Sequence, residues 1–158
     1  MRGNLYPGQS SLTFELLKAS MLELVEYIAS KNCGIVFEAI NRYENNYLNT
    51  AEETTAFVKS LGSPRIKVLL DTFHMNVEER DMAAAIRLTG DFLGHVHISD
   101  NNRHYPGNGS IDFPAVFRAL RDIGYSGWIG LEFLPGDNER LAASRGLSYV
   151  RSLWECLS

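Results

Sequence analysis

Gly34-Ile35-Val36-Phe37-Glu38 is a short, almost continuously apolar run that ends abruptly in a carboxylate. The pattern returns three more times, with a polar residue at or near the end of each run, at residues 66–71, 93–98 and 128–132. A brief run without an alternating polar face is typical of a strand buried on both faces, as in a parallel sheet. The four runs therefore predict four buried parallel strands.

A helical pattern precedes the first strand, and another follows each of the four strands. From Ser11 to Asn32 the apolar residues recur on one side of a predicted helix, at Leu17, Met21, Leu24, Val25 and Ile28. The segment Thr50 to Glu53 is a capping box, which opens a second helix that runs through Lys59. Gly62-Ser63-Pro64 ends that helix before the next strand begins.

Three more helices complete the alternation. One covers Asp81 to Leu88, and another is capped by Asp112, has Pro114 in its first turn and closes at Gly124. The last helix carries apolar residues on the face that we expect to pack, namely Ala143, Leu147, Val150 and Trp154. Strands that alternate with helices in this way indicate consecutive parallel βα units.

The fold class is α/β, and the expected architecture is half of a (β/α)8 barrel. The polar strand ends lie 33, 26 and 35 residues apart, which fits roughly thirty residues for each βα unit. A whole barrel needs about 250 residues, and this chain supplies one leading helix and four units. An open doubly wound sheet is the alternative, but Ala39-Ile40-Asn41-Arg42 replaces its usual Gly-rich phosphate turn.

Composition narrows the class of protein. The 158 residues are 45% hydrophobic and 22% charged, and they predict a single globular domain over residues 1–158 without a linker. A net charge of -4 argues against nucleic acid as a partner. The start, Met1 to Pro7, has no secretory pattern, and no long apolar run is present, so we expect a cytoplasmic protein away from membranes. Cys33 and Cys156 are expected to be small buried residues.

The strand ends carry the candidate chemistry: Glu38, Asp71, His97 and Glu132. In parallel barrels such residues converge on one mouth, and three carboxylates with one imidazole suit a hard or borderline divalent ion such as Mn²⁺, Mg²⁺ or Co²⁺. Side-by-side carboxylates repel one another unless a cation or protons compensate. Taken singly, each could instead be a helix cap or a surface charge.

Four motifs in the same order carry a resemblance to a known family. They are Phe37-Glu38-Ala39-Ile40-Asn41-Arg42-Tyr43-Glu44, Leu70-Asp71-Thr72-Phe73-His74-Met75-Asn76, His95-Val96-His97-Ile98-Ser99-Asp100-Asn101-Asn102-Arg103 and Gly130-Leu131-Glu132. Together they resemble the sugar isomerase/epimerase superfamily with the xylose isomerase-like TIM barrel, and within it the ketose 3-epimerases of the D-tagatose and D-psicose type. The resemblance implies that the chain carries barrel strands five to eight.

The resemblance also implies roles for individual residues. It makes Glu38, Asp71, His97 and Glu132 the ligands of one divalent ion, usually Mn²⁺, and makes Glu38 and Glu132 the catalytic acid and base. Glu44, His74 and Arg103 match positions that hold a sugar substrate. His95 and His104 match no ligand position, so we expect His95 to be structural. Pro106 to Gly109 is expected to be only a turn.

The implied activity is C3 epimerisation of a ketose through an enediolate, which a metal stabilises while two glutamates move the proton. The first alternative is an aldose–ketose isomerase of the hydroxypyruvate type, since the same groups would serve it. The second is a non-catalytic half-barrel that only binds metal. A DNA-repair endonuclease is disfavoured, because it needs more histidines for zinc and a positive surface.

The state of assembly follows from the strand number. Four strands cannot close a barrel, so two strand edges and the inner face of the sheet would stay open. We therefore expect a homo-oligomer, in which two copies close the barrel face to face. A monomer that covers its edges with the first helix or with the N-terminal segment is the alternative.

Overall fold

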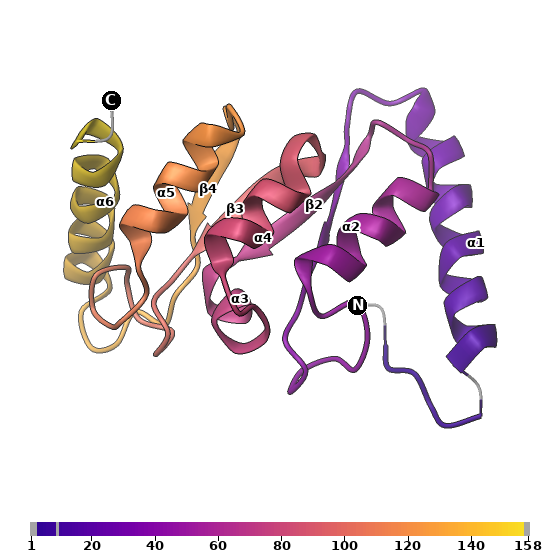
Figure 1. Cartoon of the computed structure of the whole chain (residues 1–158), viewed down its shortest axis with the longest axis horizontal. Helices are drawn as coiled ribbons and strands as arrows, with labels where there is room; N and C mark the ends of the chain where they lie inside the picture. Colours follow the sequence, from indigo (N-terminus) through magenta and orange to yellow (C-terminus); the bar gives the residue numbers. More distant parts are fainter. Residues whose placement is uncertain (1–2, 9, 157–158) are drawn as a thin grey trace.

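The computed structural model describes residues 3–8 and 10–156, and the chain alternates between strands and helices throughout (Figure 1). Met1 and Arg2, with which the sequence opens, lie outside the described residues. The strands are β1 (Ile35–Glu38), β2 (Ile66–Asp71), β3 (Leu93–Ile98) and β4 (Trp128–Leu131). The helices are α1 (Ser10–Ala29), α2 (Ala51–Ser60), α3 (Thr72–Glu78), α4 (Met82–Thr89), the 3-10 turn η1 (Gly90–Phe92), α5 (Phe113–Asp122) and α6 (Glu139–Cys156).

The sheet has the strand order of a barrel segment. Its four strands lie in the order β1-β2-β3-β4, and every neighbouring pair is parallel. Helices α2, α4 and α5 lie over the same face of the sheet (Figure 1). A doubly wound sheet would reverse its strand order at a switch point and carry helices on both faces. The sequential order therefore favours the barrel over that alternative.

The two faces of the sheet differ in burial. Val68, Leu70, Val96 and Ile98 are at most 2% exposed and form the core with the helices. Side chains alternate along a strand, so the neighbouring residues point to the opposite face, where His95 and His97 are only half-buried. In the register of the sheet His95 pairs with Trp128, whose side chain is 84% exposed. This second face is the inner face of the half-barrel, and we call it the open face.

The two caps expected from the sequence are present, and Asp81 adds a third. Thr50 and Glu53 form the reciprocal capping box of α2. The Asp81 side chain accepts the backbone N–H of Ala84 at the start of α4, and Asp112 caps α5 in the same way. These local contacts set where the helices begin, as the sequence predicts.

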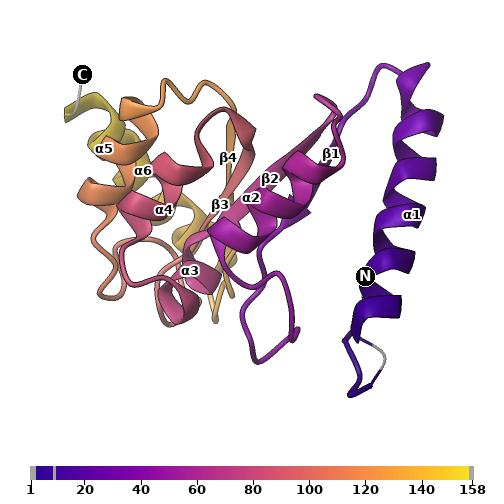
Figure 2. The ribbon, with the colours of Figure 1, turned by 45° about the vertical axis from the view of Figure 1, so that its right-hand side comes forward.

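Helix α1 packs at one side of the molecule, beside α2 (Figure 2). The rings of Phe14 and Phe57 meet edge to face with centroids 5.4 Å apart, and Met21 and Ile28 are buried. The expected apolar stripe is therefore mostly correct. Leu24 is the exception, since it is 36% exposed at the edge of the packed face.

The packed face of α6 differs from the expectation. Ala143 and Leu147 are exposed, whereas Ala142 and Gly146 are buried. A Cβ on Gly146 would lie 3.3 Å from the side chains of both Tyr105 and Pro106, so this helix approaches the loop through a residue that has no side chain. Apolar periodicity points to large residues, so it missed a contact made through small ones. Val150 and Trp154 do pack against the core as expected.

Helix α3 is a second difference, because the sequence pattern predicts no helix between Asp71 and Asp81. Asp71 ends β2 and at once caps α3, with its Oδ1 accepting the N–H of Phe73 at 2.8 Å. Seven residues are too few to show an amphipathic stripe. The direct passage from strand to helix places His74 in the first turn, next to the strand end.

The expectation for the cysteines is wrong. Both Cys33 and Cys156 are free and exposed. Cys33 lies in the loop between α1 and β1, and Cys156 is the last residue of α6, so neither lies beneath the helix layer. Within the part of the chain that the structure describes, no helix has the length and apolar character needed to cross a membrane.

Candidate metal centre and active site

The four polar residues at the strand ends come together as the sequence predicts. Glu38 and Asp71 are the last residues of β1 and β2, His97 is the last but one of β3, and Glu132 directly follows β4. The N–H of Glu132 continues the sheet by donating to the Ile98 carbonyl at 3.2 Å. One potential ligand atom from each of the four lies within 4.8 Å of the others.

These donors fit a divalent cation. Asp71 is fully buried, and His97 Nδ1 lies 3.2 Å from Glu132 Oε2 and 3.9 Å from Glu38 Oε1. That buried nitrogen atom makes no hydrogen bond to any described residue, which leaves its lone pair available for a ligand bond. Three carboxylates so close together repel one another, and a cation relieves the repulsion. Mostly oxygen donors with one imidazole nitrogen suit Mn²⁺, Mg²⁺ or Co²⁺.

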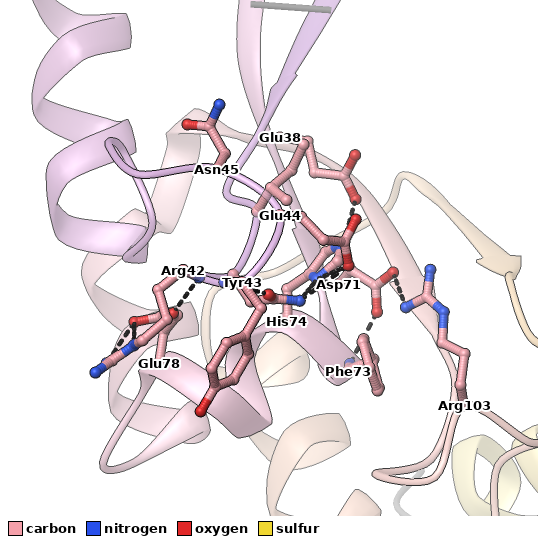
Figure 3. A network of polar contacts seen from close by, with 12 residues as sticks. Glu38, Arg42, Tyr43, Glu44, Asn45, Asp71, Phe73, His74, Glu78 and Arg103 are labelled. Carbon is pink, nitrogen blue, oxygen red and sulfur yellow. Dashed lines mark hydrogen bonds and ion pairs between the residues drawn. The ribbon is translucent and has the colours of Figure 1, made fainter. Parts of the chain in front are cut away.

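Arg103 lies against two members of this cluster. Its Nη1 donates to Asp71 Oδ2 at 2.7 Å, and its Nη2 donates to Glu132 Oε2 at 2.6 Å. The guanidinium also lies 4.6 Å from the centroid of the Phe73 ring. Figure 3 shows Arg103 reaching from its loop toward Asp71. Arg103 therefore lies at the cluster, where its guanidinium offsets part of the negative charge, and its expected role in holding a substrate stays a prediction.

The loop that carries Arg103 is built around Asp100, which sequence analysis did not single out. The Asp100 side chain is 1% exposed, and it accepts backbone N–H groups from four loop residues, Asn101, Gly107, Gly109 and Ile111. A Cβ at Gly109 would collide with this carboxylate. Pro106 to Gly109 is thus more than a turn. An aspartate ahead of a Gly- and Asn-rich loop is the signal that could have revealed it.

His74 and Glu44 lie on the Glu38 side of the cluster (Figure 3). The His74 ring is buried, with Nε2 3.7 Å from Glu38 Oε1 and Nδ1 3.9 Å from Glu44 Oε1. Burial lowers the pKa of His74, mainly because the charged ring loses its hydration, and the nearby Glu44 carboxylate only partly opposes this. A neutral imidazole at this position can donate one hydrogen bond and accept one.

Asn41 is a second residue for which the sequence pattern predicts no role. It is 2% exposed, and its Nδ2 lies 2.7 Å from His74 Nδ1 and 3.1 Å from Glu44 Oε1. A buried asparagine that contacts two candidate substrate-binding residues belongs to the site by position. Its place three residues before Glu44 and three after Glu38 was the available signal.

The two other histidines stand apart from the ligand cluster. The His95 ring meets the His97 ring edge to face at 4.9 Å, and burial lowers the pKa of His95. His104 is exposed on the loop, with its Nδ1 3.4 Å from the Leu134 carbonyl. Neither joins the four potential ligands found among the described residues.

Comparisons with known proteins agree on one family. The family model described as the xylose isomerase-like TIM barrel matches residues 2–153. The chain is 39% identical over 150 residues to the L-ribulose 3-epimerase of Methylomonas sp. (strain DH-1), covering 94% of this chain and 52% of that protein. It is 50% identical over 100 residues to the D-psicose 3-epimerase of Enterocloster bolteae, covering 62% of this chain and 33% of that protein.

Solved structures give the same result for the fold. The structure of D-psicose 3-epimerase with D-tagatose from Clostridium cellulolyticum H10 superposes with a TM-score of 0.85 at 32% identity. That match covers 90% of this chain and 56% of the other. The chain spans about half the length of the first relatives it matches, in agreement with a half-barrel of four strands.

Proposed function

The chain belongs to the xylose isomerase-like TIM barrel family, and from this premise we propose that it serves metal-dependent epimerisation of a ketose at C3. One observation carries the proposal: Glu38, Asp71, His97 and Glu132 offer ligand atoms within 4.8 Å of one another. The names of the relatives, L-ribulose 3-epimerase and D-psicose 3-epimerase, support the choice of reaction.

In this proposal the four strand-end residues hold the divalent ion, with Mn²⁺ as the first choice and Mg²⁺ or Co²⁺ as alternatives. When bound, the ion supplies Lewis-acid stabilisation for negative charge that develops on the substrate oxygens. The four residues stand at the mouth of the half-barrel, where a sugar would enter. Such chemistry needs no thiolate, and the cluster of four potential ligands contains no cysteine.

The proton moves through two carboxylates. Glu38 ends β1 and Glu132 directly follows β4, the two edge strands of the sheet, so they would approach a bound sugar from different sides. One removes the C3 proton from one face, and the other returns a proton to the opposite face, which inverts the carbon. Which of them acts first depends on the epimer that binds. His74, Glu44 and Arg103 hold the sugar oxygens.

An aldose–ketose isomerase would use the same groups. The carbon of the sugar that takes up deuterium from solvent distinguishes the two reactions. We expect the Mn²⁺-loaded protein, incubated with a ketohexose in D₂O, to place deuterium at C3, because solvent protons exchange with the catalytic carboxylates. NMR of the sugar reads the position of the label. Label confined to C1 would assign the isomerase reaction, and absence of label with every ketose of a panel would favour a half-barrel that binds metal only.

The open face points to the assembled form. We propose that a second copy of this chain covers it, with β4 of each copy beside β1 of its partner. The two copies would then supply eight parallel strands, the number of a closed barrel of this type. Trp128 is 84% exposed and Val36 43% exposed on this face, so closure would remove apolar surface from water.

Light scattering at micromolar concentration tests the assembly. We expect a mass twice that of the 17.7 kDa chain. Trp128→Glu should shift the protein toward the monomer, since it places a charge inside the proposed barrel. Leu88→Glu is the matched control, because Leu88 is 49% exposed on a helix of the opposite layer and its replacement should leave the mass unchanged. A wild-type species at the single-chain mass would exclude the dimer.

A further inference from the structure

The Asn41 side chain uses all of its hydrogen-bonding groups inside the candidate site. Its Oδ1 accepts the backbone N–H of Tyr43 at 3.0 Å. Its Nδ2 lies 3.1 Å from Glu44 Oε1 and 2.7 Å from His74 Nδ1. One amide group therefore joins the loop after β1 to a buried histidine that is 33 residues further along the chain.

The orientation of this amide is determined by its neighbours. The backbone N–H of Tyr43 can only donate, so the Asn41 atom that faces it must be the oxygen. The opposite end, which faces His74, is then the NH₂ group. The Glu44 carboxylate agrees with this orientation, because it accepts the second hydrogen of the same NH₂ group.

A donor on Asn41 decides which nitrogen of His74 carries the proton. Because the NH₂ group donates to Nδ1 at 2.7 Å, Nδ1 must accept through its lone pair. In a neutral ring the proton then sits on Nε2, the nitrogen 3.7 Å from Glu38 Oε1. A proton on Nδ1 would point at the NH₂ hydrogens, and Glu44 at 3.9 Å is too far to accept it directly.

We propose that Asn41 is a positioning residue that holds His74 in the Nε2–H tautomer, with a fixed donor directed toward Glu38 and the mouth of the site. His74 then binds an acceptor, such as a carbonyl or hydroxyl oxygen of the sugar, and takes no proton from the substrate. This consequence for substrate binding rests on the proposed function, whereas the tautomer itself does not.

The tautomer can be measured directly in the chain without metal or sugar. Protein labelled with ¹⁵N-histidine gives long-range ¹H–¹⁵N correlations for each ring, and the loss of one set of signals in His74→Gln assigns His74. In the wild type we expect Nδ1 to resonate as an unprotonated nitrogen and Nε2 as a protonated one. The opposite pattern would overturn the proposal without the need for any further variant.

Asn41→Asp provides the sharper test. Aspartate can keep the acceptor for Tyr43 N–H, but it replaces the donor at His74 with an acceptor. We therefore expect the His74 Nδ1 signal to move to the protonated range. Asn41→Leu, which removes the donor at similar volume, should leave both tautomers in exchange, with averaged shifts.

Asn46→Asp is the matched control. Asn46 is exposed in the same loop and binds the backbone of Leu5, so the substitution adds the same charge without contact to His74. Its histidine spectrum should match the wild type. An unchanged Nδ1 signal in Asn41→Asp, in a chain whose backbone amide spectrum shows it to be folded, would contradict the proposal. If the protein showed no epimerase activity, the expected His74 nitrogen shifts would be unchanged. The tautomer and the proposed epimerase function are therefore tested separately.

Discussion

Asp71→Asn is expected to abolish stoichiometric binding of a divalent ion by this chain. Asp71 is the fully buried member of the ligand cluster, with Oδ1 accepting the N–H of Phe73 and Oδ2 accepting from Arg103. Asparagine keeps the volume and the capping oxygen but removes the negative charge. Losing even an outer-shell partner typically weakens a metal site about 10–100-fold, so the loss of a buried ligand should exceed that range.

Metal analysis after dialysis against Mn²⁺, together with titration calorimetry, measures this effect. Asp81→Asn is the matched control, because Asp81 also caps a helix through a backbone N–H, that of Ala84, but is exposed and outside the cluster. We expect the control to bind one equivalent per chain, as the wild type does. Equal metal content in the wild type and in Asp71→Asn would exclude the site.

Glu38→Gln and Glu132→Gln should each reduce deuterium incorporation at C3 by about 100- to 10,000-fold, the usual contribution of a positioned acid or base. Each variant removes one of the two carboxylates that exchange the proton. The rate is measured by NMR of the sugar in D₂O, at saturating metal. Because both residues are also proposed ligands, the metal content of each variant must be measured beside the rate.

The choice of starting epimer distinguishes the roles of the two glutamates. If the two glutamates act on opposite faces of C3, each removes the proton from a different C3 epimer. One variant should therefore fail to deprotonate the first epimer, and the other variant should fail to deprotonate the second. Glu139→Gln, an exposed change in the first turn of α6, should exchange at the wild-type rate. Wild-type exchange by either active-site variant with metal bound would remove that residue from the catalytic pair.

Much of this architecture could be predicted because it depends on local patterns. Four apolar runs at βα spacing predict the strands, and the capping residues Thr50, Asp81 and Asp112 mark three helix starts within a few residues. The four strand-end residues converge because parallel strands end at one edge of a sheet. Their assembly follows directly from the strand assignments.

The contacts within the site could not be predicted in the same way. Arg103 binds Asp71 across 32 residues, and Asn41 binds His74 across 33. Such pairs arise only when the fold brings a loop beside the end of a strand or the start of a helix that is distant in the sequence. The sequence contains these residues, but no short-range pattern in it indicates that they are in contact.

The sequence by itself determined the α/β class, the order of the elements and the four strand-end residues, because backbone propensity, capping and apolar periodicity act over a few residues. Only the tertiary structure decided the roles of Asn41 and Asp100 and the packed face of α6. Hydrogen-bond partners are chosen by direction and distance in space, and a helix that packs through Gly146 does so because of the shape of the surface it meets. Both depend on the assembled sheet.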